Sequence, residues 1–269
     1  MSFKIGFAVN PEGKSPPTVN HPARVAEPRP CLAEVCFPDY ERTYTYYNDR
    51  YDLQVGDQVF VEGKLEGVRG RVVGVNYTFK IKLADYKRVI HRADTRVEGT
   101  LTMADNHFIT VDPETLSFEQ VQGWLMPPPE PAEVVVGSGG DDPFPLDVLA
   151  ESGIPQEIAA RGHEYYLQGR VACLEKIGDR CRALVMGGHT YTVEFTLQDG
   201  MVSDLVCDCY CPGRCKHQMA ALLQMQESLE LALRNGLDTE DYLLAVHQHL
   251  FCEMVVRARC SGTLRVSAG

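Results

Sequence analysis

Segment 206–218 constrains this chain more than any other feature, because it places four cysteines within nine residues. It reads Val-Cys-Asp-Cys-Tyr-Cys-Pro-Gly-Arg-Cys-Lys-His-Gln, and the other six of the ten cysteines are scattered singly. The first ten residues are too short and too weakly apolar for a secretory signal, so a disulfide framework is disfavoured. A tight group of thiols in a protein predicted to be cytoplasmic indicates a metal site.

The spacing of the donors in this segment suits one tetrahedral zinc ion. Cys207-x-Cys209 is followed, after five residues, by Cys215-x-His217, and three thiolates with one imidazole are typical zinc ligands. Residues i and i+2 of a strand point to the same side, so Cys207 and Cys209 can converge on one ion. Cys215 is predicted to open a helix, whose dipole favours the thiolate. Four protein ligands leave no position for water, so we predict one structural zinc ion per chain.

The residues around these ligands resemble a known family. The C-x-H pair is followed by Ala-Ala-Leu-Leu at 220–223, and residues 161–171 read Arg-Gly-His-Glu-Tyr-Tyr-Leu-Gln-Gly-Arg-Val. Together with the C-x-C pair, they resemble the SWIM-type zinc finger over residues 146–225. The resemblance implies zinc binding and the recognition of DNA, RNA or a protein partner, such as a helicase of the chromatin-remodelling type. It implies no enzymatic activity.

The zinc ligands can be assigned in two registers. Many members of the family have proline directly after the second cysteine, whereas here Tyr210 follows Cys209 and a proline follows Cys211. Cys209-x-Cys211 is therefore an alternative to Cys207-x-Cys209. The position of Gly200, seven residues before Cys207, favours the first register. Cys211 is then a spare thiol or a substitute ligand.

Composition along the chain predicts an α+β protein with two folded parts. Residues 1–30 are rich in proline and predict an extended leader. Short β-type runs separated by glycines predict a small barrel-like all-β domain over residues 31–125. Prolines, glycines and acidic residues concentrate at 126–145, which predicts a linker. Residues 146–269 are predicted to form the SWIM-type domain, with antiparallel hairpins, a zinc loop and C-terminal helices.

Within the second part, hydrophobic patterns and turn residues predict the order of elements. Asp199-Gly200 is a strong signal for a two-residue hairpin, which would deliver the first cysteines. Helices are predicted at 146–167, 218–233 and 238–250. Strands are predicted at 171–177, 182–186, 190–197 and 201–209.

A basic segment stands out in the first part of this acidic chain. Eight basic and two acidic residues lie between Arg69 and Arg96, although the whole chain has a net charge of −11. Lys80 and Lys82 are predicted to share one face of a strand at 78–83. Basic strands next to tyrosines commonly bind single-stranded nucleic acid. The alternative is a solvated face above core tyrosines. The candidate contacts are Lys80, Lys82, Lys87 and Arg88, and the neighbouring rings are Tyr40, Tyr44, Tyr46, Tyr47 and Tyr51.

Composition and motifs exclude several classes of function. Clustered basic residues are needed to neutralise phosphates, so a protein with this net charge does not coat DNA with its whole surface. No run of 18 apolar residues predicts a membrane span, and no hydrolase, metalloprotease or phosphate-loop motif predicts an enzyme. The first hypothesis is a nucleic-acid-associated recognition protein. The second is a protein-interaction adaptor, because residues 151–269 contain 11 basic and 15 acidic residues.

Overall fold

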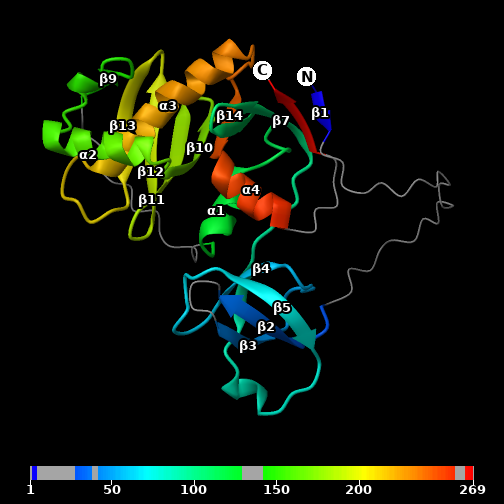
Figure 1. The fold of residues 1–269 in the computed structure, drawn as a ribbon. Helices are drawn as coiled ribbons and strands as arrows, with labels where there is room; N and C mark the ends of the chain where they lie inside the picture. Colours follow the sequence, from blue (N-terminus) through cyan, green and yellow to red (C-terminus); the bar gives the residue numbers. More distant parts are fainter. Residues whose placement is uncertain (1, 5–27, 38–41, 129–141, 258–263, 269) are drawn as a thin grey trace.

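The computed structural model describes residues 2–4, 28–37, 42–128, 142–257 and 264–268. These residues form a five-stranded sheet, a ten-stranded sheet and four α-helices. The small sheet lies below the large sheet in Figure 1, and strands from the two ends of the chain meet at one edge of the large sheet. The mixed architecture agrees with the predicted α+β class.

The small sheet has the order β3-β2-β5-β4-β6 and is antiparallel throughout. Alternating apolar residues such as Val35, Phe37 and Val72 form its core. It is not a closed barrel, contrary to the prediction. The four-residue strand β6 pairs with β4, and one isolated bridge joins Tyr47 of β3 to Arg88, the residue before β6. The strands are β2 (Cys31–Phe37), β3 (Arg42–Asn48), β4 (Gln58–Val61), β5 (Gly70–Asn76) and β6 (Val89–Arg92).

The large sheet has the order β1-β15-β7-β8-β14-β10-β11-β12-β13-β9. All neighbouring strands are antiparallel except the parallel pair β15 and β7. The hairpin predicted at Asp199-Gly200 joins β12 to β13, and both residues have positive φ. The strands are β1 (Ser2–Lys4), β7 (Gly99–Ala104), β8 (His107–Thr110), β9 (Phe144–Pro145), β10 (Val171–Ile177), β11 (Arg180–Met186), β12 (Thr190–Gln198), β13 (Met201–Cys207), β14 (Tyr242–His247) and β15 (Leu264–Ala268).

Helices cover both faces of the large sheet (Figure 1). Successive residues of a strand point to opposite faces. In β14, Leu244 joins the core formed with α1 and α4, whereas Ala245 packs with Leu231 of α3. Gly162 lets α2 approach α3 closely, because a Cβ atom at this position would lie 2.4 Å from Met219 Cβ. The helices are α1 (Phe118–Leu125), α2 (Gln156–Leu167), α3 (Lys216–Arg234) and α4 (Gln248–Arg257).

Two predicted helices differ from the structure. The helix predicted over 238–250 is wrong, because residues Tyr242–His247 form strand β14 between β8 and β10. A central strand that is buried on both faces is a continuous apolar run, and its periodicity cannot be told from that of a buried helix. The helix predicted at 146–167 begins only at Gln156, after Pro155.

The predicted segments are distributed over the two sheets as follows. Strands β7 and β8 and helix α1 lie within the predicted 31–125 segment, but they pair and pack with the large sheet. In the predicted linker, Phe144–Pro145 pairs with β13, and residues 129–141 lie outside the described residues. In the predicted leader, Ser2–Lys4 pairs with β15, and residues 5–27 lie outside the described residues.

Polar contacts join the small sheet to helices on one face of the large sheet. Arg69 donates a hydrogen bond to the carbonyl oxygen of Trp124 at 2.8 Å and forms an ion pair with Glu253 of α4 at 2.5 Å. His91 Nε2 lies 3.0 Å from the carbonyl oxygen of Gly123. The two sheets are therefore in direct contact.

Candidate metal centre

Three short elements bring four metal-ligating side chains together at the end of the hairpin. Cys207 ends β13, Cys209 lies in the following turn, Cys215 is the N-cap of α3, and His217 lies in the first turn of that helix. Their donor atoms all lie within 4.8 Å of one another. A Cys3His group of this size can hold one metal ion.

The measured separations fit a tetrahedral ion. His217 Nδ1 lies 3.8 Å from Cys207 Sγ and 3.9 Å from Cys215 Sγ. Around a tetrahedral zinc ion, a sulfur and a nitrogen ligand lie about 3.5 Å apart, and two sulfur ligands lie about 3.8 Å apart. Nδ1 is therefore the ring nitrogen placed to bind the ion, and Nε2 would carry the proton. Soft thiolates with one imidazole are the donor set that zinc prefers.

The helix start is fixed by a reciprocal cap. The Cys215 side chain accepts a hydrogen bond from the backbone N–H of Gln218, and the Gln218 side chain accepts one from the backbone N–H of Cys215 at 2.7 Å. The carbonyl oxygen of Leu205 accepts hydrogen bonds from Gln218 Nε2 at 3.1 Å and from Arg214 at 2.9 Å. These contacts tie the loop and the helix to β13, so the backbone positions Cys215 beside the hairpin.

Two tyrosines enclose the ligand His217. The ring of Tyr191, from β12, stacks on the imidazole with centroids 4.2 Å apart, and the Tyr165 ring of α2 meets it edge-on at 5.7 Å. Lys216 donates a hydrogen bond to the Tyr165 hydroxyl at 2.7 Å. His217 is 4% exposed, and within the described residues its Nε2 atom has no hydrogen-bond partner. Ring packing therefore orients this ligand in place of a second hydrogen bond.

The three thiols have very different pKa values when no metal is bound. Hydrogen bonds from Cys207, from His217 and from the Gln218 backbone lower the pKa of Cys215 to about 4. The same contact with Cys215, together with burial, raises the pKa of Cys207 well above its usual range. Burial also raises the pKa of Cys209 to about 11. Cys215 is thus the first thiolate available to a metal, and the ion must displace protons from the other two thiols.

Cys211 and its neighbour Tyr210 are exposed beside this group. Cys211 is exposed and is not among the four residues whose donor atoms converge. Tyr210 is fully exposed, at 102% of its reference area. Sequence reasoning named the four converging residues but missed the enclosing rings of Tyr165 and Tyr191. The alternation of apolar residues in β12 was the only signal for Tyr191.

The basic residues expected to bind nucleic acid lie in the connection between β5 and β6. Residues 77–82 are irregular rather than a strand, so Lys80 and Lys82 do not share a strand face. Both are exposed, as is Lys87. Arg88 is partly buried, forms an ion pair with Asp49 at 3.0 Å and lies over the Tyr47 ring at 5.2 Å.

The tyrosines named with these residues are unequally placed. Tyr46 and Tyr47 are buried, Tyr51 is half-buried and Tyr44 is 40% exposed, whereas Tyr40 lies outside the described residues. The exposed rings of the connection itself, Tyr77 and Phe79, were not foreseen. The sequence signal for these rings was the alternation of apolar residues at 77, 79 and 81 with polar residues at 78, 80 and 82.

Two findings concern the chain as a whole. Among the described residues, no helix is long and apolar enough to cross a membrane. Comparisons with protein families, curated proteins and solved structures found no match to this chain.

Proposed function

We propose that this chain is a non-enzymatic recognition protein with a SWIM-type module that a structural zinc ion stabilises. The observation that carries the proposal is the convergence of Cys207, Cys209, Cys215 and His217 within 4.8 Å. Four protein donors complete a tetrahedral shell, so a bound zinc ion would have no position for a reacting water. The zinc would therefore hold the loop and the start of α3 against β13.

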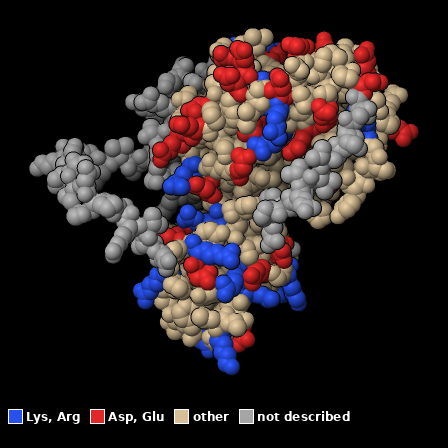
Figure 2. Space-filling model, turned by 180° about the vertical axis from the view of Figure 1, so that it is seen from behind, with Lys and Arg blue, Asp and Glu red and all other residues tan. Residues whose placement is uncertain are grey.

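We further propose that the connection 77–88 of the small sheet contacts single-stranded nucleic acid. Lys80, Lys82 and Lys87 form no ion pair within the described residues, and Tyr77 and Phe79 are 50% and 40% exposed. Free ammonium groups bind phosphates, and exposed rings stack with unpaired bases. Figure 2 shows basic side chains around the small sheet, whereas acidic side chains are frequent over the large sheet. This charge distribution would direct a polyanion to the small sheet.

Fluorescence anisotropy with a labelled single-stranded oligonucleotide, measured over a series of salt concentrations, tests this contact. We expect the double variant Lys80→Gln/Lys82→Gln to reduce the salt slope by about two units, because about one counterion is released per phosphate contact. Arg161→Gln is the matched control, because this exposed residue lies on α2, away from the small sheet. Tyr77→Ala should weaken single-strand binding more than duplex binding, since only unpaired bases can stack on the ring.

The test also separates this proposal from a protein-interaction adaptor. Absence of oligonucleotide binding at low salt, by a chain whose circular dichroism shows that it is folded, would refute the nucleic-acid contact. The adaptor is favoured by one observation, the full exposure of Tyr210 beside the metal ligands. Exposed aromatic residues often anchor protein interfaces. For the adaptor, Tyr210→Ser should weaken binding to a partner, such as a remodelling-type helicase, without changing the metal content.

A further inference from the structure

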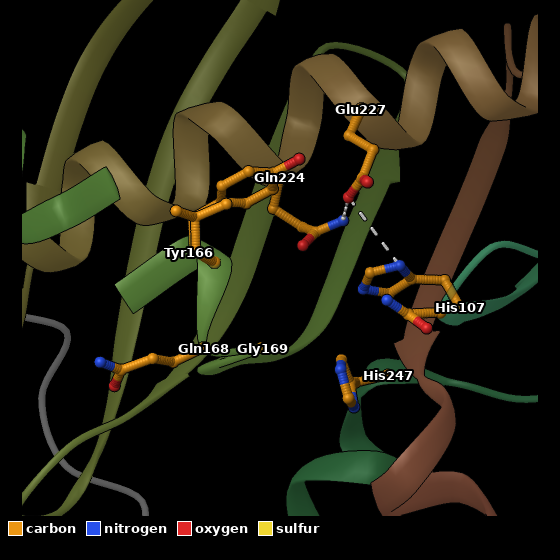
Figure 3. A pocket seen from close by; sticks show the side chains of 9 residues that line it. His107, Tyr166, Gln168, Gly169, Gln224, Glu227 and His247 are labelled. Atoms are coloured by element: carbon orange, nitrogen blue, oxygen red, sulfur yellow. Dashed lines mark hydrogen bonds and ion pairs between the residues drawn. The ribbon is translucent and has the colours of Figure 1, made fainter. Parts of the chain in front are cut away.

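A pocket of about 320 Å³ lies on the α3 side of the large sheet (Figure 3), and none of the four candidate metal ligands lines it. The end of α2 forms one side of it, with Tyr166, Gln168 and Gly169. Glu227 of α3 and His107 of β8 lie on the other side, and His247 of β14 lies below them in the figure. His107 and His247 are paired across neighbouring strands, which places both rings on one face of the sheet.

His107 is a buried polar group without a partner. The residue is 5% exposed, and within the described residues neither ring nitrogen has a hydrogen-bond partner. Its Nδ1 atom lies 3.9 Å from Glu227 Oε2, which is too far for a direct hydrogen bond. Glu227 Oε2 already accepts a hydrogen bond from Gln224 Nε2 at 2.8 Å, but a carboxylate oxygen has a second lone pair, so Oε2 and His107 Nδ1 can still share one donor group placed between them. An unpartnered buried polar atom is costly, so a ligand that satisfies it is favoured.

The protonation of the two histidines leaves the acceptor of the pocket at His107, because His247 uses its Nδ1 lone pair on the backbone and would carry its proton on Nε2. Burial, together with the nearby His247, lowers the pKa of His107 to about 4, so its ring is neutral at pH 7 and keeps one free lone pair. Burial and the nearby His249 also lower the pKa of His247. His247 Nδ1 accepts a hydrogen bond from the backbone N–H of His249 at 3.3 Å. The pocket therefore offers a neutral imidazole beside a carboxylate.

The charges around the pocket favour a cation. No lysine or arginine is among the residues that line it. Burial raises the pKa of Tyr166, and the charges of Glu227, Asp105 and Glu230 raise it further. The C-terminal end of α2 lies at the pocket, and the partial negative charge of a helix C-terminus attracts cations. The first residue of α4, Gln248, does not point a free N–H group at the pocket, because its backbone N–H donates to the carbonyl oxygen of Asn106. This N–H therefore does not repel a bound cation.

We propose that this pocket binds a small organic cation through a primary ammonium group. The ammonium would lie between Glu227 and His107 and donate a hydrogen bond to each. A metal ion fits less well, because among the described residues only the cysteine cluster brings three or more ligand atoms within 4.8 Å of one another. The volume also suits a ligand of several atoms. The pocket lacks a side chain at position 169, where a Cβ atom would lie 2.5 Å from His247 Nε2.

Binding of n-butylammonium to the full chain tests the proposal. Two-dimensional NMR spectra of the histidine side chains report binding through the ring signals of His107. These signals are assigned as the ones missing from the spectrum of His107→Gln. We expect saturable shifts of these signals and an affinity that falls at least about tenfold in Glu227→Gln, because a charged hydrogen bond is lost. Glu157→Gln is the matched control. This residue carries the same charge and is exposed, but it lies in the first turn of α2, at the opposite end of that helix from the pocket.

Two further probes define what would overturn the proposal. n-Butanol has no charge and n-butyltrimethylammonium has no N–H donor, so both should bind at least about tenfold more weakly than n-butylammonium. Equal binding of all three probes, equal affinity of Glu227→Gln and wild type, or no saturable shift would overturn the proposal. If Glu227→Gln does not fold, the same test uses the folded variant His107→Gln. We expect calorimetry to show that this variant no longer binds n-butylammonium.

Discussion

The two sheets differ in how they hold their exposed connections. The small sheet has its own apolar core, and its connection 77–88 leaves three lysines and two aromatic rings exposed. The large sheet has a short connection after β13 in which Cys207, Cys209 and Cys215 converge with His217. Few apolar side chains are available in that loop, so ligation of a metal ion would stabilise it in place of hydrophobic burial. The comparison shows that one loop brings together side chains that can hold a metal ion, whereas the other leaves lysines and aromatic rings exposed.

Removal of the metal ligands should produce the largest effect and should be confined to the large sheet. Cys215→Ala removes both a ligand and the N-cap of α3, so we expect a loss of more than about 3 kcal/mol of unfolding free energy. Hydrogen exchange should show loss of protection at residues 207–219 and unchanged protection in β2, β4 and β5. Loss of protection in both sheets together would show that the metal stabilises the whole molecule.

The buried His107 should make stability depend on pH, independently of the metal. Its folded-state pKa of about 4 lies below the ordinary value of 6.5, so the unfolded state binds more protons between these values. Stability is therefore expected to fall as the pH drops from 6.5 to 4, by up to about 3 kcal/mol. Urea unfolding of wild type and His107→Gln should show a shallower dependence in the variant. Parallel pH profiles would contradict a neutral buried imidazole.

The contact between the sheets should have a smaller effect. Arg69 joins the small sheet to the Trp124 carbonyl and to Glu253, and it is partly exposed. Arg69→Ala should lower the unfolding free energy by about 1–2 kcal/mol. Arg71→Ala, an exposed arginine of β5, is the matched control and should change stability by less than about 0.5 kcal/mol. Equal effects of the two substitutions would mean that the Arg69 contacts do not couple the sheets.

Local sequence signals identified the hairpin and the cysteine group, because both depend on neighbouring residues. Asp199-Gly200 specifies a turn by its own backbone preferences, and the short C-x-C and C-x-H spacings keep each pair of ligands close along the chain, although β13 ends at Cys207 and strand alternation does not place Cys209. Strand β14 could not be predicted, since an apolar run that is buried on both faces has no distinctive period.

Contacts between distant segments were also beyond the sequence. The parallel pair β7 and β15 joins residues near 100 to residues near 266, and no local pattern encodes such a pairing. His107, Glu227 and His247 come from three separate elements. The pocket therefore becomes visible only when the sheet and α3 are assembled. The stacking of Tyr191 on His217 depends in the same way on the packing of β12 against α3.

Metal content measured by mass spectrometry on purified wild type, Cys207→Ala and Cys211→Ala tests the central claim most directly. The two variants remove a thiol from the same loop, but only Cys207 belongs to the converging group. We predict one zinc ion per chain in wild type and in Cys211→Ala, and a loss of zinc in Cys207→Ala. Zinc retained by Cys207→Ala and lost from Cys211→Ala, or a zinc-replete wild type that holds none, would contradict the account.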